Sequence, residues 1–140
     1  MLTYCGWFTF SFLGDQCHPI SWGPWKFDLV VDPTNTPMLI TWCAYDGSQN
    51  LYSIGVEQTM EADTPYFLAV YWDGDTMGLS VNGAEWETAS TCETLYDDPN
   101  AVLRVAGDPS DAGPVSCTKF KAYPRVLTNA EIASLYQEGA

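Results

Sequence analysis

The chain has 140 residues, of which 46% are hydrophobic and 14% aromatic, so it can form one domain with a packed core over residues 1–140. Its 18 acidic and five basic side chains give a net charge of −13, which argues against a nucleic-acid partner because that affinity depends on Lys and Arg contacts to phosphate. The same charge disfavours anionic membranes, and no apolar run reaches the ~18 residues of a membrane helix.

The first predicted strand covers residues 7–13, where aromatic and polar side chains alternate. Phe8, Phe10 and Phe12 share one face, which we expect to be buried. Residues 14–24 are predicted to be irregular because prolines and glycines interrupt them. Three further strands are predicted over residues 26–31, 38–45 and 51–56.

The most informative stretch covers residues 66–83. Residues 66–72 are continuously β-branched, aromatic or aliphatic, so both faces of this strand should be covered. A turn at residues 73–74 leads into a second strand, and Asn82-Gly83 is the strongest short signal for a primed hairpin turn. Two reversals this close together predict an antiparallel meander. Later strands are predicted over residues 84–91, 101–106 and 115–123.

The last residues are predicted to form the helix of the chain. Thr128 is a good N-cap, and Glu131 three residues later completes a capping box. Leu127 can pack against Ile132 as a hydrophobic staple, and Gly139 supplies the stop. Together these elements predict an all-β, two-sheet antiparallel sandwich with one short C-terminal helix.

Three segments in this order resemble the laminin-G-like jelly roll of the concanavalin A-like lectin and glucanase superfamily. They are Phe8-Thr-Phe-Ser-Phe12, the hairpin from Ala69 to Gly83, and the ending Tyr123-Pro-Arg-Val-Leu-Thr-Asn-Ala-Glu-Ile132. The family normally has a strand ahead of the first segment, and here only seven residues precede Phe8. The resemblance therefore implies an open sheet edge, which a strand of another chain would fill at Phe8, Phe10 and Phe12.

Catalysis is not predicted. Glycosidases of this superfamily carry the motif Glu-x-Asp-x-x-Glu on a strand. The most similar segment of this sequence begins at Glu61 and has Asp63 as its second carboxylate. Tyr66 replaces the third carboxylate, and Pro65 breaks the alternation that would direct the set into a cleft. The single histidine, His18, gives a Ser-His-Asp site little support.

Calcium is the one cofactor that the resemblance suggests, because relatives often hold this ion at the rim of the sandwich. Asp97 and Asp98 precede the predicted strand 101–106, and Asp108 and Asp111 follow it, so the four could meet at one rim. We favour the alternative that they are independent surface acids. The odd number of cysteines and the absence of a Cys-x-x-Cys pair favour buried free thiols at Cys5, Cys17, Cys43, Cys92 and Cys117. One or two disulfides are the alternative if the protein works outside a cell.

Sugar binding requires exposed aromatic faces beside hydrogen-bonding groups. Trp22, Trp25 and Trp86 have polar or loop neighbours and are the candidate glycan-binding residues, although core or interface packing explains them equally well. Trp42 and Trp72 lie in densely apolar strands and are expected in the core.

The sequence lacks the basic start and cleavage site of a signal peptide. Our first hypothesis is a non-catalytic interaction domain on the surface of a larger assembly, namely a virion, as a capsid decoration or tail protein. Its partners would be other protein subunits, in a homo- or hetero-oligomer, and it would also adhere to glycans. The alternative is a stand-alone or secreted lectin-like carbohydrate-binding domain.

Overall fold

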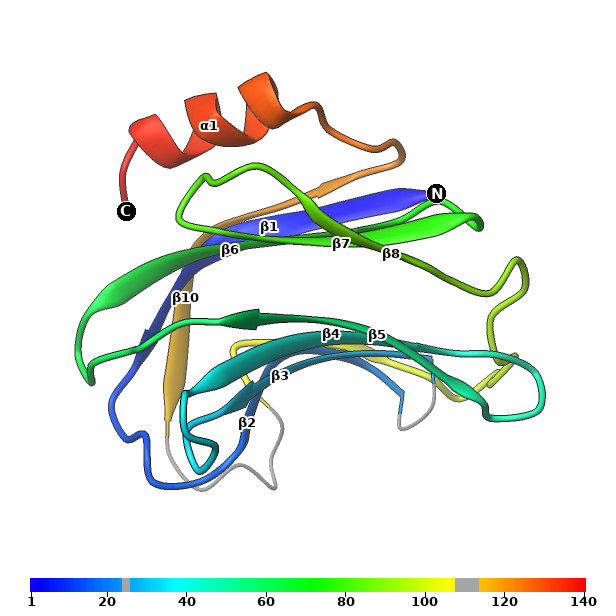
Figure 1. Cartoon of the computed structure of the whole chain (residues 1–140), viewed down its shortest axis with the longest axis horizontal. Helices are drawn as coiled ribbons and strands as arrows, with labels where there is room; N and C mark the ends of the chain where they lie inside the picture. The colour runs from blue at the N-terminus through cyan, green and yellow to red at the C-terminus, as the bar shows by residue number, and fades with distance from the viewer. Residues whose placement is uncertain (24–25, 108–113) are drawn as a thin grey trace.

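Two antiparallel sheets of five strands each face one another, and one helix lies outside them (Figure 1). The computed structural model describes residues 1–23, 26–107 and 114–140. Sheet A has the strand order β10-β1-β6-β7-β8, and sheet B has the order β5-β4-β3-β2-β9. The elements are β1 (Leu2–Phe10), β2 (Cys17–Trp22), β3 (Phe27–Asp32), β4 (Leu39–Tyr45), β5 (Leu51–Glu57), β6 (Pro65–Trp72), β7 (Thr76–Val81), β8 (Glu87–Ser90), β9 (Leu103–Val105), β10 (Val115–Tyr123) and α1 (Asn129–Gln137). The predicted all-β, jelly-roll-like sandwich with a terminal helix is confirmed.

The central meander has the predicted form. β6 pairs with β7 from Leu68↔Val81 to Trp72↔Met77, and β7 pairs in turn with β8. Asn82 and Gly83 have φ values of 53° and 73°, which a primed turn requires at both central positions. Gly83 is also needed for space, because a Cβ there would lie 2.6 Å from the Cβ of Tyr136 on α1.

The segment predicted to be irregular, residues 14–24, contains β2, so that prediction was wrong. Pro19 is tolerated inside this strand because the register against β3 shifts between Cys17 and Ile20. A β-bulge leaves one residue out of the ladder, and a proline there removes no required N–H donor. The Pro19 carbonyl still accepts a hydrogen bond from the Ala106 N–H at 2.9 Å.

The open edge expected at Phe8, Phe10 and Phe12 does not exist in the folded chain. β1 pairs on one side with β10 and on the other with β6 along most of its length, so it lies inside sheet A. Phe8 and Phe10 are fully buried between the sheets. Phe12 lies beyond the end of β1 and is 51% exposed. The prediction failed because β10, from the end of the described chain, pairs with the side of β1 that was expected to be open.

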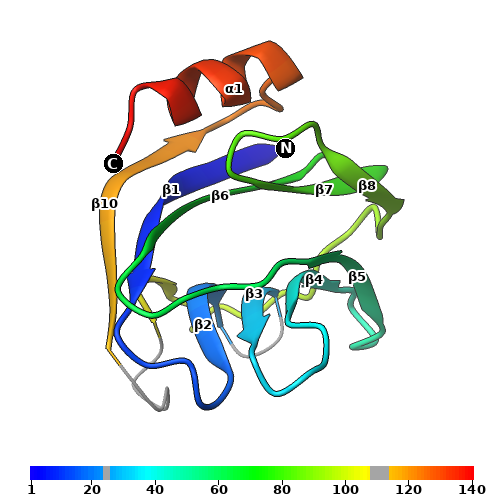
Figure 2. The same cartoon turned by 60° about the vertical axis from the view of Figure 1, so that its left-hand side comes forward.

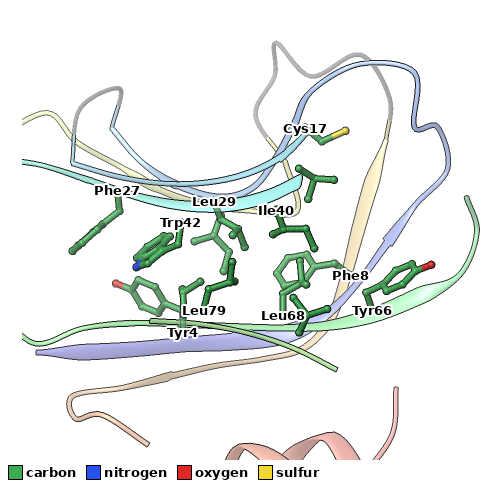
Figure 3. Close-up of a cluster of buried hydrophobic side chains, with 14 of the residues drawn as sticks. Tyr4, Phe8, Cys17, Phe27, Leu29, Ile40, Trp42, Tyr66, Leu68 and Leu79 are labelled. Carbon is green, nitrogen blue, oxygen red and sulfur yellow. The ribbon is translucent and has the colours of Figure 1, made fainter. Parts of the chain in front are cut away.

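The core between the sheets contains large side chains from both layers (Figure 3). Trp42 on β4 is fully buried and stacks on Phe27, with ring centroids 5.0 Å apart and planes 11° apart. Its indole N–H donates to the carbonyl oxygen of Tyr71 on β6 at 3.0 Å, which satisfies the buried donor and links the two sheets.

The helix α1 lies over sheet A on the side away from sheet B (Figure 2). A second, smaller cluster of buried side chains joins α1 to that face of the sheet. Ile132 of the helix is fully buried there, and Trp7 stacks on Tyr136 with ring centroids 5.5 Å apart. Both halves of the predicted capping box form, between Thr128 and Glu131. The helix is therefore held by a cap at its start and by one apolar stripe against the sheet.

Cys5, Cys43, Cys92 and Cys117 are free thiols, as predicted, and Cys17 is the remaining one of the five cysteines. Four of them are buried, and Cys117 is half-buried. Among residues 1–23, 26–107 and 114–140, no helix is long and apolar enough to cross a bilayer.

Candidate functional site

An open groove of about 200 Å³ lies between the end of β10 and α1. Its walls combine one aromatic ring, two leucines and three polar side chains, a mixture typical of small-ligand sites. The residues that line it are Tyr123, Arg125, Leu127, Glu131, Ser134 and Leu135.

The segment that joins β10 to α1 is fixed in place by hydrogen bonds from the sheet. The buried Thr3 hydroxyl donates to the Arg125 carbonyl oxygen at 2.6 Å and accepts from the Leu127 N–H at 3.3 Å. The Trp86 indole N–H donates to the Leu127 carbonyl oxygen at 2.9 Å, and the Asn129 side chain accepts from the Trp86 backbone N–H at 3.0 Å. The groove is therefore held in one shape before any ligand binds, by Thr3 of β1 and by Trp86 in the loop before β8.

An ion pair closes the end of the groove at the start of α1. The Arg125 guanidinium donates to both carboxylate oxygens of Glu131, at 2.9 and 2.7 Å. Glu131 also accepts from the Thr128 backbone N–H at 2.8 Å. The pKa of Glu131 is lowered to about 2, mainly by the hydrogen bond from Arg125 and next by the hydrogen bond from the Thr128 N–H.

Two lysines of β10 reach the other end of the helix. The Lys119 ammonium donates to the Gly139 carbonyl oxygen at 2.7 Å, and the Lys121 ammonium donates to Glu138 at 3.2 Å. The last turn of α1 carries no basic residue of its own, so these lysines supply the positive charge that a helix C-terminus favours. A cavity of about 10 Å³ beside them shares Leu135 with the groove.

The seam between β10 and α1 therefore gathers positive charge on an acidic protein. Lys119, Lys121 and Arg125 are three of the five basic residues in the chain. The other two, Lys26 and Arg104, are next to or within sheet B. The seam also contains Glu131 and Glu138, so it is close to neutral, whereas the whole chain carries −13. An anionic ligand would meet less repulsion there than over a surface with the chain's average charge.

The tryptophans predicted to bind glycans are engaged in internal contacts where the structure describes them. The Trp22 ring lies near Tyr4 and Phe27, with centroids 6.5 and 6.3 Å away, and the Lys26 ammonium lies 4.4 Å from its ring centroid. Trp86 uses its indole N–H on Leu127 and meets Tyr71 edge-on at 4.9 Å. These contacts favour structural roles for both residues. Trp25 lies outside the described residues, and a glycan role for the three stays a prediction.

The acids of the predicted calcium site are described in part. Asp97 is exposed, and the Asp98 carboxylate accepts from the Asn100 backbone N–H at 2.9 Å, as in a local turn. Asp108 and Asp111 lie outside the described residues. Within the described parts of the chain, no group of three or more His, Cys, Asp or Glu residues is placed to hold a metal ion. Calcium binding stays a prediction.

Sheet B carries a polar cluster that the sequence analysis missed. The His18 Nδ1 atom lies 2.9 Å from the Asp28 carboxylate, and Ser21 of β2 is directly opposite Asp28 of β3. These three residue types can form a nucleophilic site, but the Ser21 hydroxyl oxygen is buried and has no hydrogen-bond partner in the described chain. It is therefore not activated by His18. The register of β2 against β3 shifts between Cys17 and Ile20, next to His18, and the spacing of His18 and Asp28 in the sequence gives no signal of their contact.

No family model matches the chain, and no curated protein matches it. Among solved structures, it is similar to the receptor-binding domain of botulinum neurotoxin type G, at 13% identity and a TM-score of 0.72. It is also similar to the botulinum neurotoxin serotype D ligand-binding domain in complex with N-acetylneuraminic acid, at 15% identity and a TM-score of 0.75. These alignments cover 98% of this chain and 38% and 36% of those proteins, respectively. The likeness establishes the fold, and the chain spans little more than a third of their length.

Proposed function

We propose that this chain is a non-catalytic recognition domain that binds an acidic carbohydrate in the groove between β10 and α1. The observation that carries the proposal is the groove itself, in which an aromatic wall and hydrogen-bonding side chains lie beside Arg125, on the seam that holds three of the five basic residues. Such a combination meets both needs of an acidic sugar, a ring to stack on and a surround that is close to neutral on an otherwise acidic protein.

Each wall of the groove has a distinct role in this proposal. The half-buried ring of Tyr123 would stack on the C–H face of a sugar ring, and the Ser134 hydroxyl would bond a sugar hydroxyl. Leu127 and Leu135 supply apolar contact. Arg125 has a side chain that is 51% exposed, and its guanidinium would attract the carboxylate or sulfate of the ligand.

The carboxylate chemistry of the groove supports recognition without hydrolysis. Among the described residues that line it, Glu131 is the one carboxylate, whereas glycoside hydrolysis uses two. With a pKa of about 2, Glu131 is ionised at neutral pH and is held by Arg125, so it cannot act as a general acid.

The structural neighbours motivate the choice of ligand class. The serotype D ligand-binding domain forms a complex with N-acetylneuraminic acid, which is an acidic sugar. That observation concerns a protein of which this chain matches 36%, so it suggests which sugars to test, and the groove of this chain supplies the side chains that would bind them.

The test is an NMR titration of the protein with paired acidic and neutral oligosaccharides of matched backbone. We expect acidic members to shift resonances of Tyr123 and Ser134 and to bind more tightly than their neutral counterparts. The variant Tyr123→Leu should bind about tenfold more weakly, which corresponds to about 1.4 kcal/mol. Tyr45→Leu, on sheet B, is the matched control and should bind normally. If no acidic sugar shifts the resonances of Tyr123 or Ser134, the proposal is wrong. If neutral sugars bind as tightly as acidic ones, the charge of the ligand does not contribute to binding.

We further propose that the domain works on the surface of a larger assembly, with a virion as the first candidate. The observation that favours assembly is the long edge strand β5 of sheet B, whose outer side pairs with no other described strand. Electron microscopy of particles from the producing cells, labelled with an antibody against this chain, tests the role. Label confined to soluble material, with none on particles, would contradict it.

A further inference from the structure

The two sheets end in four edge strands, and these edges differ in how they are protected. β8 has four residues and β9 has three, so neither offers a long template. β10 carries Lys119 and Lys121, a positive φ of 52° at Lys119 and a register shift against β1. Lysines, bulges and short length are the devices by which proteins block edge-to-edge pairing.

β5 has none of these devices. It contains seven residues, Leu-Tyr-Ser-Ile-Gly-Val-Glu, without proline or lysine. All seven pair with β4 in one unbroken register, from Tyr45↔Leu51 to Leu39↔Glu57. β5 is therefore the longest regular and unprotected edge among the described strands.

The hydrogen bonds at its two ends show which backbone groups of β5 point outward. The Asp46 N–H donates to the Asn50 carbonyl at 3.1 Å, and the Gln58 N–H donates to the Met38 carbonyl at 3.0 Å. Hydrogen-bonded pairs alternate along an antiparallel ladder, so the even-numbered residues of β5 bond to β4. The outward N–H and C=O groups then belong to Leu51, Ser53, Gly55 and Glu57.

The side chains of β5 bring the core up to this edge. The even-numbered residues Tyr52, Ile54 and Val56 are half-buried and pack against the core between the sheets. On the opposite face Leu51 is 55% exposed. A strand paired with β5 would place further side chains beside Tyr52, Ile54 and Val56 and would cover the part of their apolar surface that is still exposed at the edge of the sheet.

We propose that β5 pairs antiparallel with β5 of a second copy of this chain, about a two-fold axis at Ile54. The two B sheets then become one continuous sheet. This pairing names a partner for the assembly proposal above, and it does not depend on carbohydrate binding.

The sequence of β5 is complementary to itself in this register. Tyr52 lies opposite Val56 of the second copy, and aromatic–β-branched pairs of this kind stabilise sheets. Ser53 lies opposite Gly55, which leaves space for close approach. Glu57 is the single charged residue of the strand and lies opposite Leu51, so no like charges face each other directly.

The net charge gives the pairing a distinctive salt dependence. Each copy carries −13, so two copies repel one another at low ionic strength. Added salt screens this repulsion and should strengthen self-association. A cationic partner on the same edge would bind more weakly as salt is added, so the sign of the salt effect distinguishes the two.

Sedimentation and hydrogen exchange test the proposal together on the full chain. From about 0.05 M to about 0.5 M salt, we expect a monomer–dimer equilibrium to shift toward the dimer. As the dimer forms, the amides of Leu51, Ser53, Gly55 and Glu57 should become protected, whereas those of Tyr52 and Ile54 are protected already in the monomer. A monomer at every salt concentration, up to hundreds of micromolar protein, would overturn the proposal.

A matched pair of variants locates the interface. Ser53→Pro removes one outward N–H without removing a bond to β4, and it should weaken the dimer at least about tenfold. Ser53→Thr keeps the N–H and should dimerise normally. Circular dichroism checks that both variants are folded. A dimer that Ser53→Pro leaves intact, or dimerisation without protection of the outward amides, would also overturn the proposal. Absence of the chain from particles would refute only the virion role.

Discussion

Truncation of Ile132 to alanine tests how α1 is attached to sheet A. Ile132 is fully buried among Leu127, Trp7 and Phe67. The change removes three carbon atoms, which corresponds to about 2.4 kcal/mol of lost transfer free energy at about 0.8 kcal/mol per carbon. A cavity contribution raises the cost, but the helix can settle toward the sheet, so we expect a total of about 3 kcal/mol.

Thermal unfolding measures this cost directly. About 3 kcal/mol corresponds to a fall in Tm of roughly 6–12 °C for a chain of this length. Ile132→Val is the matched control and should cost about 1 kcal/mol. Near-ultraviolet circular dichroism should weaken in the alanine variant, because the stacked pair of Trp7 and Tyr136 lies beside the cavity. A Tm within about 2 °C of wild type would refute the view that this one residue anchors the helix.

Two further predictions concern ionisable groups. The pKa of Glu131 is lowered from its ordinary 4.5 to about 2 by the hydrogen bonds from Arg125 and then Thr128, so its ionised form stabilises the fold. The Tm difference between wild type and Glu131→Gln should be fully present above pH 4.5 and vanish as the pH falls to about 2; a difference that grows on acidification would contradict this account. Burial raises the pKa of Cys5 to about 11 and of Cys43 to about 12, so a thiol reagent at about pH 8 should label these two only after unfolding, and rapid labelling of either in the native protein would refute their burial.

Much of the fold follows from local signals in the sequence. Residues 115–123 were predicted as a strand and form β10 with the same bounds, because apolar and polar residues bounded by proline define them. The capping box at Thr128 and the primed turn at Asn82-Gly83 were found because each depends on residues close in sequence. Such features are specified by the residues that form them.

The errors arose where pairing between distant residues decides the structure. Pro19 in the sequence indicates irregular backbone, yet it lies in β2, which tolerates the bulge because it pairs with β3 on one side and with β9 on the other. The expectation of an open edge at Phe8 followed from counting residues before it, whereas β10 covers that side of β1. The groove was missed for the same reason: Tyr123 and Ser134 come together only after the chain folds back onto Thr3.

The place of β1 between β6 and β10 has a consequence for how the chain is made. Thr3 pairs with Tyr123, and Phe10 pairs with Val115, so one side of β1 is completed by residues that are synthesised much later than β1 itself. During synthesis β1 can pair with β6 but must wait for β10, and contacts so distant in sequence form slowly. The nascent chain therefore carries, for a time, an open strand edge at β1 that β10 covers in the folded domain.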